Sequence, residues 1–274
     1  MSAFIAQSVE PGQRVKRPRP MRANAGVRAA YHEVLLREIA AMRHDVTTTI
    51  LREYRGNYPH LAQDASPLEG LHRTFGRLMD KWQSRFDSFA EIAAQGFVGQ
   101  AASSATRGVS SALKDLGFTV KFQRSHTVNL AIEGCLAENV NLIKSIPSGC
   151  LGEVVDLVET SAKSGRDIGA LTKDIKSRFD VADSRAALIA RDQNNKVTAN
   201  VTRARQKELG IKQGRWRHSG FSTAPRPSHV AADGEIFDLD KGLYLDGKWV
   251  LPGEAINCGC TWTMIIPGYN DGQP

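Results

Sequence analysis

The hydrophobic spacing of the chain changes near Gly210, and this change constrains most strongly what the last third can fold into. In the run 184–210, Ala190, Val197 and Val201 follow one another at steps of seven and four, which places them on one face of a helix. Gly210 is a suitable end for that helix, because glycine accepts the left-handed conformation in which helices commonly stop. The run therefore predicts one long helix that ends at Gly210.

Beyond this helix the chain carries signals of short strands and tight turns. Asp233-Gly234 and Asp246-Gly247 favour two-residue hairpin turns, in which both central residues need positive φ. Residues 261–266 predict a closing strand. Three tryptophans are predicted to bury against one another or against the long helix, as a small aromatic core: Trp216, Trp249 and Trp262. The sequence therefore predicts a compact set of hairpins after the helix.

The chain before residue 184 has the spacing of several amphipathic helices. Apolar residues recur at steps of three and four in the stretches 31–51, 71–92, 105–116, 136–146, 151–158 and 168–179. Aromatic side chains along 71–92 are interpreted as core, since that face must be buried. Pro147 is predicted to end one helix, and Asp183 or Ser184 to cap the long one. Residues 118–122 fit either a short strand or the approach to a helix that begins near Ser125.

These patterns predict an α+β fold, with a mainly helical body followed by a small C-terminal module of β-hairpins. We expect three segments. Residues 1–27 form a basic, proline-rich arm, residues 28–184 form the helical body, and residues 185–274 form a module of one long helix plus hairpins.

Positive charge is concentrated near the start of the chain. Six basic residues and one acid lie between positions 10 and 28, whereas the region from position 211 onward is close to neutral. Prolines among the basic residues disfavour a helix and indicate an extended arm. The arm is interpreted either as a solvated tail or as a segment that lies along an acidic partner surface or packaged DNA. On DNA it would gain affinity by neutralising phosphates. The candidate contact residues are Arg14, Lys16, Arg17, Arg19 and Arg22.

A series of short motifs in the last third resembles a known signature. RDQNNK at 191–196, ELGI at 208–211, GRW at 214–216, RPSH at 226–229 and NCGC at 257–260 occur in the order found in phage head morphogenesis proteins, the minor head proteins of the Mu F-like family. The dense part of the resemblance covers about 185–262, and a looser part begins near Leu142. The CxC carries glycine where the family commonly has arginine. The acidic residue usual after the GRW strand is replaced by Gly220-Phe221.

His229, Cys258 and Cys260 form the strongest candidate for a chemical site. Zinc accepts imidazole nitrogen and thiolate sulfur in a tetrahedron, and His218 or Asp233 could supply a fourth ligand. The alternative interpretation is structural, with the cysteines as small buried apolar residues and the histidine bonded to the backbone. A disulfide between residues two apart would be strained. Whether a zinc cofactor is present therefore stays open at this point.

No catalytic motif accompanies these residues. HExxH, a phosphate-binding loop and a nucleophile elbow are all missing from the sequence, so we expect a protein that is not an enzyme. No apolar run approaches the ~20 residues that span a bilayer, and the first residues lack the pattern of a secretory signal. We expect a protein that is made in the host cytoplasm and makes no membrane contact.

The resemblance implies a structural minor head protein of a tailed phage, located in the virion head. It implies a role in procapsid assembly and DNA packaging or ejection, with the portal protein, other head proteins and packaged DNA as partners. One alternative is a nucleic-acid-binding protein that acts without a capsid, through the arm and the helix face of Arg203, Arg205 and Lys207. Another is a zinc-dependent hydrolase or toxin-like enzyme.

Overall fold

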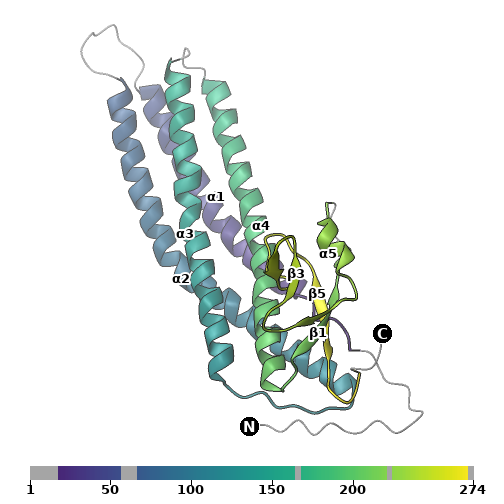
Figure 1. Cartoon of the computed structure of the whole chain (residues 1–274). Helices are drawn as coiled ribbons and strands as arrows, with labels where there is room; N and C mark the ends of the chain where they lie inside the picture. Colours follow the sequence, from purple (N-terminus) through teal and green to yellow (C-terminus); the bar gives the residue numbers. More distant parts are fainter. Residues whose placement is uncertain (1–17, 57–66, 164–167, 221–223, 271–274) are drawn as a thin grey trace. The chain divides into compact units, whose positions relative to one another are not determined.

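The computed structural model describes residues 18–56, 67–163, 168–220 and 224–270. Four long helices account for most of these residues, and a short helix and five short strands follow them (Figure 1). The helices are α1 (Ala25–Gly56), α2 (Pro67–Asp115), α3 (His126–Lys163), α4 (Ile168–Glu208) and α5 (Pro227–Ala231). The strands are β1 (Gln213–Arg217), β2 (Ile236–Asp238), β3 (Leu243–Leu245), β4 (Lys248–Val250) and β5 (Thr261–Ile265). The predicted α+β class, a helical body and a small β module, is confirmed.

The helices are longer than predicted, because three predicted boundaries lie inside them. α2 covers both 71–92 and 105–116, since small buried residues such as Ala101 continue the packed face between them. α4 runs through the predicted cap, where the Ser184 hydroxyl donates to the carbonyl of Asp180, one turn back in the same helix. The predicted start of a helix at Asp183 or Ser184 is therefore wrong.

α3 likewise continues through Pro147, which we expected to end it. Proline has no N–H to donate within a helix, and its ring disturbs the preceding turn. The side chain of Gln83 on α2 donates to the carbonyl of Lys144, at 3.1 Å, beside this irregularity. Packing against a neighbouring helix thus adds a hydrogen bond within one turn of the proline, and α3 runs on past it.

The stretch 118–122 contains no strand, which decides between the two interpretations left open for it. α2 ends at a turn in which Gly117 has a φ of 95°, and the N–H of Phe118 donates to the carbonyl of Leu113. α3 then begins at His126, and the hydroxyl of Ser125 accepts the backbone N–H of Val128. The described chain between the two helices is therefore an extended connection.

The described residues divide into two compact units. Unit 2 comprises Ala29–Gln95 and Ala137–Ala190, and unit 1 comprises the described parts of Met1–Arg28, Gly96–Leu136 and Arg191–Pro274. α4, the helix that opens the predicted 185–274 module, contributes residues to both. No helix among the described residues has the length and apolar character needed to cross a membrane.

The core of unit 2 consists of apolar faces from four helices, as their three- and four-residue spacing predicts. Its largest fully buried side chains are Leu35, Ile39, Met42, Ile50, Leu71, Trp82, Phe86, Ile143 and Phe179. Ile92, which we placed on the α2 face, is instead 75% exposed. The buried face advances from Phe86 to Ala90 and Phe97 because a helix has 3.6 residues per turn.

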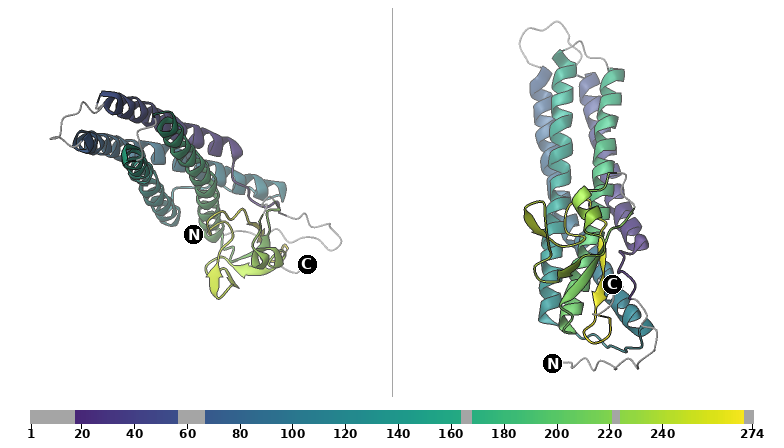
Figure 2. Two further views of the ribbon diagram at one scale, coloured as in Figure 1. Left: turned by 90° about the horizontal axis from the view of Figure 1, so that it is seen from above. Right: turned by 45° about the vertical axis from the view of Figure 1, so that its right-hand side comes forward.

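Unit 1 holds the β module, whose green and yellow strands lie against the C-terminal part of α4 (Figure 2). β1 is the central strand of an antiparallel sheet in the order β2-β1-β5. β3 and β4 form a separate hairpin, and both of its turn residues, Asp246 and Gly247, have positive φ as predicted. The second predicted hairpin turn, at Asp233-Gly234, is wrong. Those residues connect α5 to β2, and only Gly234 has a positive φ.

Two of the three tryptophans belong to the core of unit 1. Trp216 on β1 and Trp262 on β5 are fully or almost fully buried, and each packs edge to face against Phe237. Trp249 is 61% exposed and contacts Tyr244 across the β3–β4 hairpin, so its predicted place in the core is wrong. Side chains alternate between the two faces of a strand, and in β4 the next residue, Val250, is the buried one.

Candidate functional site

His229, Cys258 and Cys260 converge in unit 1. His229 lies in α5, and the cysteines flank Gly259 just before β5. The His229 Nδ1 is 3.5 Å from the Cys258 Sγ and 3.7 Å from the Cys260 Sγ. All three residues are buried, and their ligand atoms lie within 4.8 Å of one another. The fold therefore brings together a group that is separated by about thirty residues in the sequence.

The motifs of the resemblance hold this group in place by contacting one another. Asp192 of RDQNNK accepts the backbone N–H of Asn257 at 2.9 Å, and Asn195 donates to the Cys258 carbonyl at 3.2 Å. Arg226 of RPSH, just before α5, donates to the carbonyl of Ile256 at 2.9 Å. α4 and Arg226 thus hold the backbone of residues 256–258, where NCGC begins.

The turn between the cysteines lies close against Ser219, which favours glycine there. A Cβ on Gly259 would lie 3.0 Å from the Ser219 Oγ and 3.1 Å from its Cβ. Asn257, just before the turn, has a φ of 59°, and Arg191 donates to its side-chain oxygen at 2.6 Å. Glycine between the cysteines, where the family commonly has arginine, therefore matches the close approach of Ser219.

The two thiols differ in their acid strength. A hydrogen bond with Cys260, helped by the backbone N–H groups of Gly253 and Cys260, lowers the pKa of Cys258 to about 5, although burial acts in the opposite direction. The same hydrogen bond and burial raise the pKa of Cys260 well above its usual range. Cys258 is therefore the more acidic of the two thiols.

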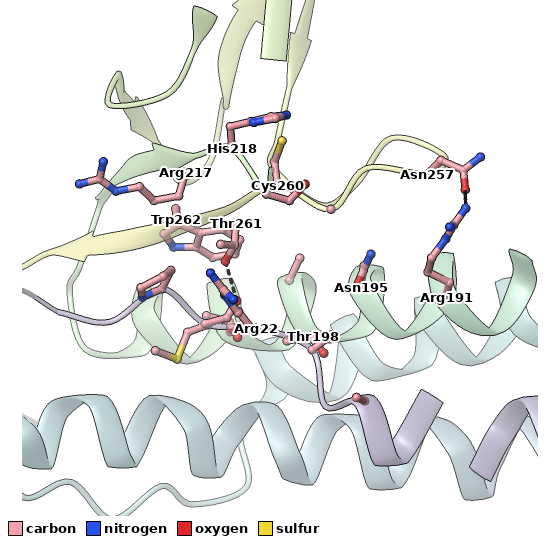
Figure 3. Close-up of a pocket in the computed structure, with 18 of the residues that line it drawn as sticks. Arg22, Arg191, Asn195, Thr198, Arg217, His218, Asn257, Cys260, Thr261 and Trp262 are labelled. Carbon is pink, nitrogen blue, oxygen red and sulfur yellow. Dashed lines mark hydrogen bonds between the residues drawn. The ribbon is translucent and has the colours of Figure 1, made fainter. Parts of the chain in front are cut away.

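A basic cavity of about 1020 Å³ lies beside this group, within unit 1 (Figure 3). Its wall includes Cys260 and Trp262, and the polar side chains of Asn195 and Thr198. Four arginines and one carboxylate line it: Arg22, Arg28, Arg191, Arg217 and Asp233. Of these four arginines, only Arg22 was a candidate from the sequence, because the others belong to different elements that only the fold brings together. Such a cavity favours an anionic ligand.

The described part of the basic arm is fastened to unit 1. The Met21 carbonyl accepts from the Thr261 hydroxyl at 2.5 Å, and the Asn24 carbonyl accepts from the Asn194 side chain at 3.0 Å. Arg19 forms an ion pair with Asp115 at the end of α2. The other three candidates, Arg14, Lys16 and Arg17, lie outside the described residues. Residues 18–24 form no helix or strand, and these bonds hold them within unit 1.

Two further candidates from the sequence do not join the metal-ligand group. Among the described residues, that group contains neither His218 nor Asp233. The His218 ring instead accepts the N–H of Gly220, and Asp233 accepts the backbone N–H of His218 at 2.8 Å. Both residues line the basic cavity. They therefore stabilise the segment after β1.

The helix face of Arg203, Arg205 and Lys207 does not form the open basic surface that nucleic-acid binding would need. Arg205 is buried, pairs with Glu208 and lies over the ring of Phe122. Burial lowers the pKa of Arg203, and Lys207 forms an ion pair with Asp240. Within the described residues, unit 1 therefore offers the cavity, rather than this helix face, to an anionic partner.

The fold and the site together define a helical protein whose C-terminal β module is held by its own motifs around a histidine and two cysteines. Residues 152–263 match the family described as Phage Mu protein F like protein. This match confirms the resemblance drawn from the C-terminal motifs, and its position in the chain.

One similar protein comes from Haemophilus influenzae and is named only as an uncharacterized protein. The two sequences are 28% identical over 261 residues, which cover 92% of this chain and 56% of that protein. The chain thus spans little more than half the length of its relative. No solved structure matches the chain significantly.

Proposed function

We propose that this chain is a structural minor head protein of a tailed phage, which joins the head during procapsid assembly through the portal. The observation that carries the proposal is the match of 152–263 to the Mu F-like family. The geometry supports it, because the motif residues Asp192 and Asn195 bond to the NCGC segment, and Arg226 bonds to the carbonyl of Ile256 just before it. These polar side chains therefore stabilise the module, and a protein that acts by docking needs a stable module.

Mass spectrometry of purified heads tests this proposal. A phage lacking the gene is complemented with a tagged copy of the chain, and procapsids and mature particles are purified separately. We expect the chain in both, and the portal protein to be recovered with the tagged chain from infected cells. Absence from both kinds of particle, or normal infectious yield without the gene, would contradict the proposal.

A Trp216→Ala variant provides a structural control for the same experiment. Trp216 is fully buried and belongs to unit 1, so its loss acts on the β module rather than on the core of unit 2. We expect this variant to be lost from heads, whereas Trp249→Ala, at an exposed position, is retained. Equal incorporation of both variants would show that the β module is not needed for assembly.

Packaged DNA is proposed as a second partner, at the basic cavity. Four arginines from separate segments line it together with one carboxylate, so a phosphate gains from their combined field. DNA retention by the purified chain is measured against salt concentration for wild type and for the pair Arg22→Gln and Arg217→Gln. Each lost phosphate contact lowers the slope of log affinity against log salt by about 0.9.

The matched control removes two arginines from the exposed surface of the same unit, Arg107→Gln and Arg124→Gln. We expect a clearly smaller change in slope for this pair. The same slope for both pairs would show that DNA does not use the cavity. Strong DNA retention by a chain that is absent from heads would instead favour a nucleic-acid-binding protein that acts without a capsid.

A further inference from the structure

We propose that His229, Cys258 and Cys260 bind one Zn²⁺ ion that cross-links α5 to the segment before β5. Zinc–sulfur bonds of about 2.3 Å and a zinc–nitrogen bond of about 2.0–2.1 Å in a tetrahedron place nitrogen and sulfur about 3.6 Å apart. The observed separations between the His229 Nδ1 and the two sulfurs are 3.5 Å and 3.7 Å. The histidine nitrogen already lies at the distance from each sulfur that a tetrahedral ion requires.

The surroundings of the sulfurs favour bound thiolates. The buried indole N–H of Trp216 has no hydrogen-bond partner among the described residues. Its nearness to Cys260 opposes the rise in the pKa of that thiol, as does the backbone N–H of Ser219. The backbone N–H groups of Gly253 and Cys260 likewise lower the pKa of Cys258. Donors directed at ligand sulfurs are the outer-shell contacts that orient metal ligands and stabilise their charge.

The ligand set selects zinc over the common hard cations. Two thiolates and one imidazole suit Zn²⁺, whereas Mg²⁺ and Ca²⁺ take oxygen ligands. Tetrahedral zinc needs one more ligand, and the described residues add no fourth histidine, cysteine or carboxylate to the group. Cys260 also lines the basic cavity, so water from that side completes the coordination.

Such an ion would cross-link two segments of the chain that contain little regular secondary structure. α5 is one short helix, and the segment from Leu251 to Cys260 has no strand. His229 lies against Trp216 at 5.3 Å between ring centroids, so the ion would also fix the main aromatic side chain of β1. The inference is independent of the proposed head function, since a metal-free chain could still join heads.

Metal analysis of the purified full-length chain tests the inference. We expect one zinc per chain after incubation with excess Zn²⁺ and gel filtration. Replacement by Co²⁺ should give the thiolate-to-cobalt charge-transfer band and the visible bands of a tetrahedral site. Cys258→Ser and Cys260→Ser should each lose zinc and the charge-transfer intensity. Sub-stoichiometric zinc in the folded wild-type chain, together with absence of these bands, would overturn the proposal.

Cys150→Ser is the matched control, because Cys150 is also buried and free but lies in unit 2. This variant should keep one zinc per chain. A chelator provides a second measurement if a cluster variant folds poorly. It should lower the melting temperature of wild type and of Cys150→Ser by the same amount, because both lose a ligand that binds only the native state. An unchanged wild-type melting temperature would count against a structural zinc ion.

Discussion

The indole of Trp262 joins the sheet to the long helix before it through a single buried hydrogen bond. Its Nε1 donates to the side-chain oxygen of Gln206 on α4 at 2.7 Å, and both residues are buried. Gly214 on the neighbouring strand leaves the space for the ring, since a Cβ there would lie 2.6 Å from the Trp262 Cδ1. The Trp262 side chain therefore both fills space in the core and donates the hydrogen bond that the buried Gln206 oxygen accepts.

Trp262→Phe should lower the free energy of unfolding by about 1–3 kcal/mol, because it leaves the buried Gln206 oxygen without its donor. The same substitution at the exposed Trp249 should change stability by no more than about 0.5 kcal/mol. Denaturant unfolding of the two variants beside wild type measures both values. Equal effects would show that the Trp262 hydrogen bond does not contribute.

Asp45 has a comparable role in unit 2. Its carboxylate accepts from the buried Trp82 indole and from Lys81, each at 2.8 Å. Asp45→Ala should cost about 1–3 kcal/mol, since the indole N–H loses its acceptor. Asp45→Asn keeps an oxygen at that position and should cost less. Urea unfolding compares them, and a larger loss in the asparagine variant would contradict this reasoning.

The same carboxylate gives a pH dependence. Burial raises the pKa of Asp45, but the hydrogen bonds from Lys81 and Trp82 outweigh it, and the net shift is downward. A lowered folded-state pKa means that this contribution is complete above the unfolded value of about 3.9 and is lost as the pH falls through the folded value. The difference in the free energy of unfolding between wild type and Asp45→Asn should therefore stay constant above about pH 4 and narrow below it. Urea unfolding at a series of pH values measures this difference.

The sequence grouped His229, Cys258 and Cys260, which the fold places close together, but it did not show what surrounds them. Two cysteines around one residue, with a histidine upstream, are recognisable from residue type alone. The cavity arginines Arg28, Arg191 and Arg217 are not recognisable in this way, because nothing in their spacing shows that α1, α4 and β1 meet. Trp249 was misplaced for a related reason. The spacing of a three-residue strand does not show which of its two faces is buried.

At the scale of elements, the helices differ from the prediction mainly in length. Small residues within α2 and the serine within α4 resemble helix ends when read locally, yet buried contacts on either side keep these helices continuous. Propensity is weaker than tertiary packing in such cases. The end of α4 was predictable, because it depends on one residue. Gly210 has a φ of 75°, and the N–H of Ile211 donates to the Gln206 carbonyl in a Schellman turn.

Gly210→Ala should destabilise the chain by about 1–2 kcal/mol, the cost of a left-handed conformation for an L-residue. No atom lies within 4 Å of the added methyl group, so the effect is one of backbone conformation alone. Gly99→Ala is the control, because Gly99 is exposed inside α2 and its Cβ also meets nothing. It should stabilise the chain by about 0.5–1 kcal/mol. Thermal unfolding should show opposite signs for the two variants.

At the scale of the whole molecule, the two compact units differ in their dependence on the proposed metal. The ligand group lies in unit 1, whereas unit 2 has a core of apolar helix faces and the single buried cysteine Cys150. Burial raises the pKa of that thiol to about 12. It is therefore a structural side chain that stays protonated at neutral pH.

Chelation of zinc should increase hydrogen exchange in β1 and β5 and leave the α1 residues 31–50 unchanged. The reason is that the ion stabilises only the unit that contains its ligands. Exchange followed by mass spectrometry, with and without chelator, measures both regions. Faster exchange in α1, or unchanged exchange in β1, would contradict a metal confined to unit 1.

Unit 1 is built from segments near the start, the middle and the end of the chain. This arrangement determines the order in which the two units can fold during translation. All of unit 2 has been synthesised once Ala190 is added, so its four helical segments can assemble while translation continues. Unit 1 must wait for β5, because Thr261 bonds to Met21 and Trp262 bonds to Gln206. A nascent chain stalled between these two points would expose Val109 and Leu113 of α2, which share a core with Trp262 and Met264 of β5 in the folded chain.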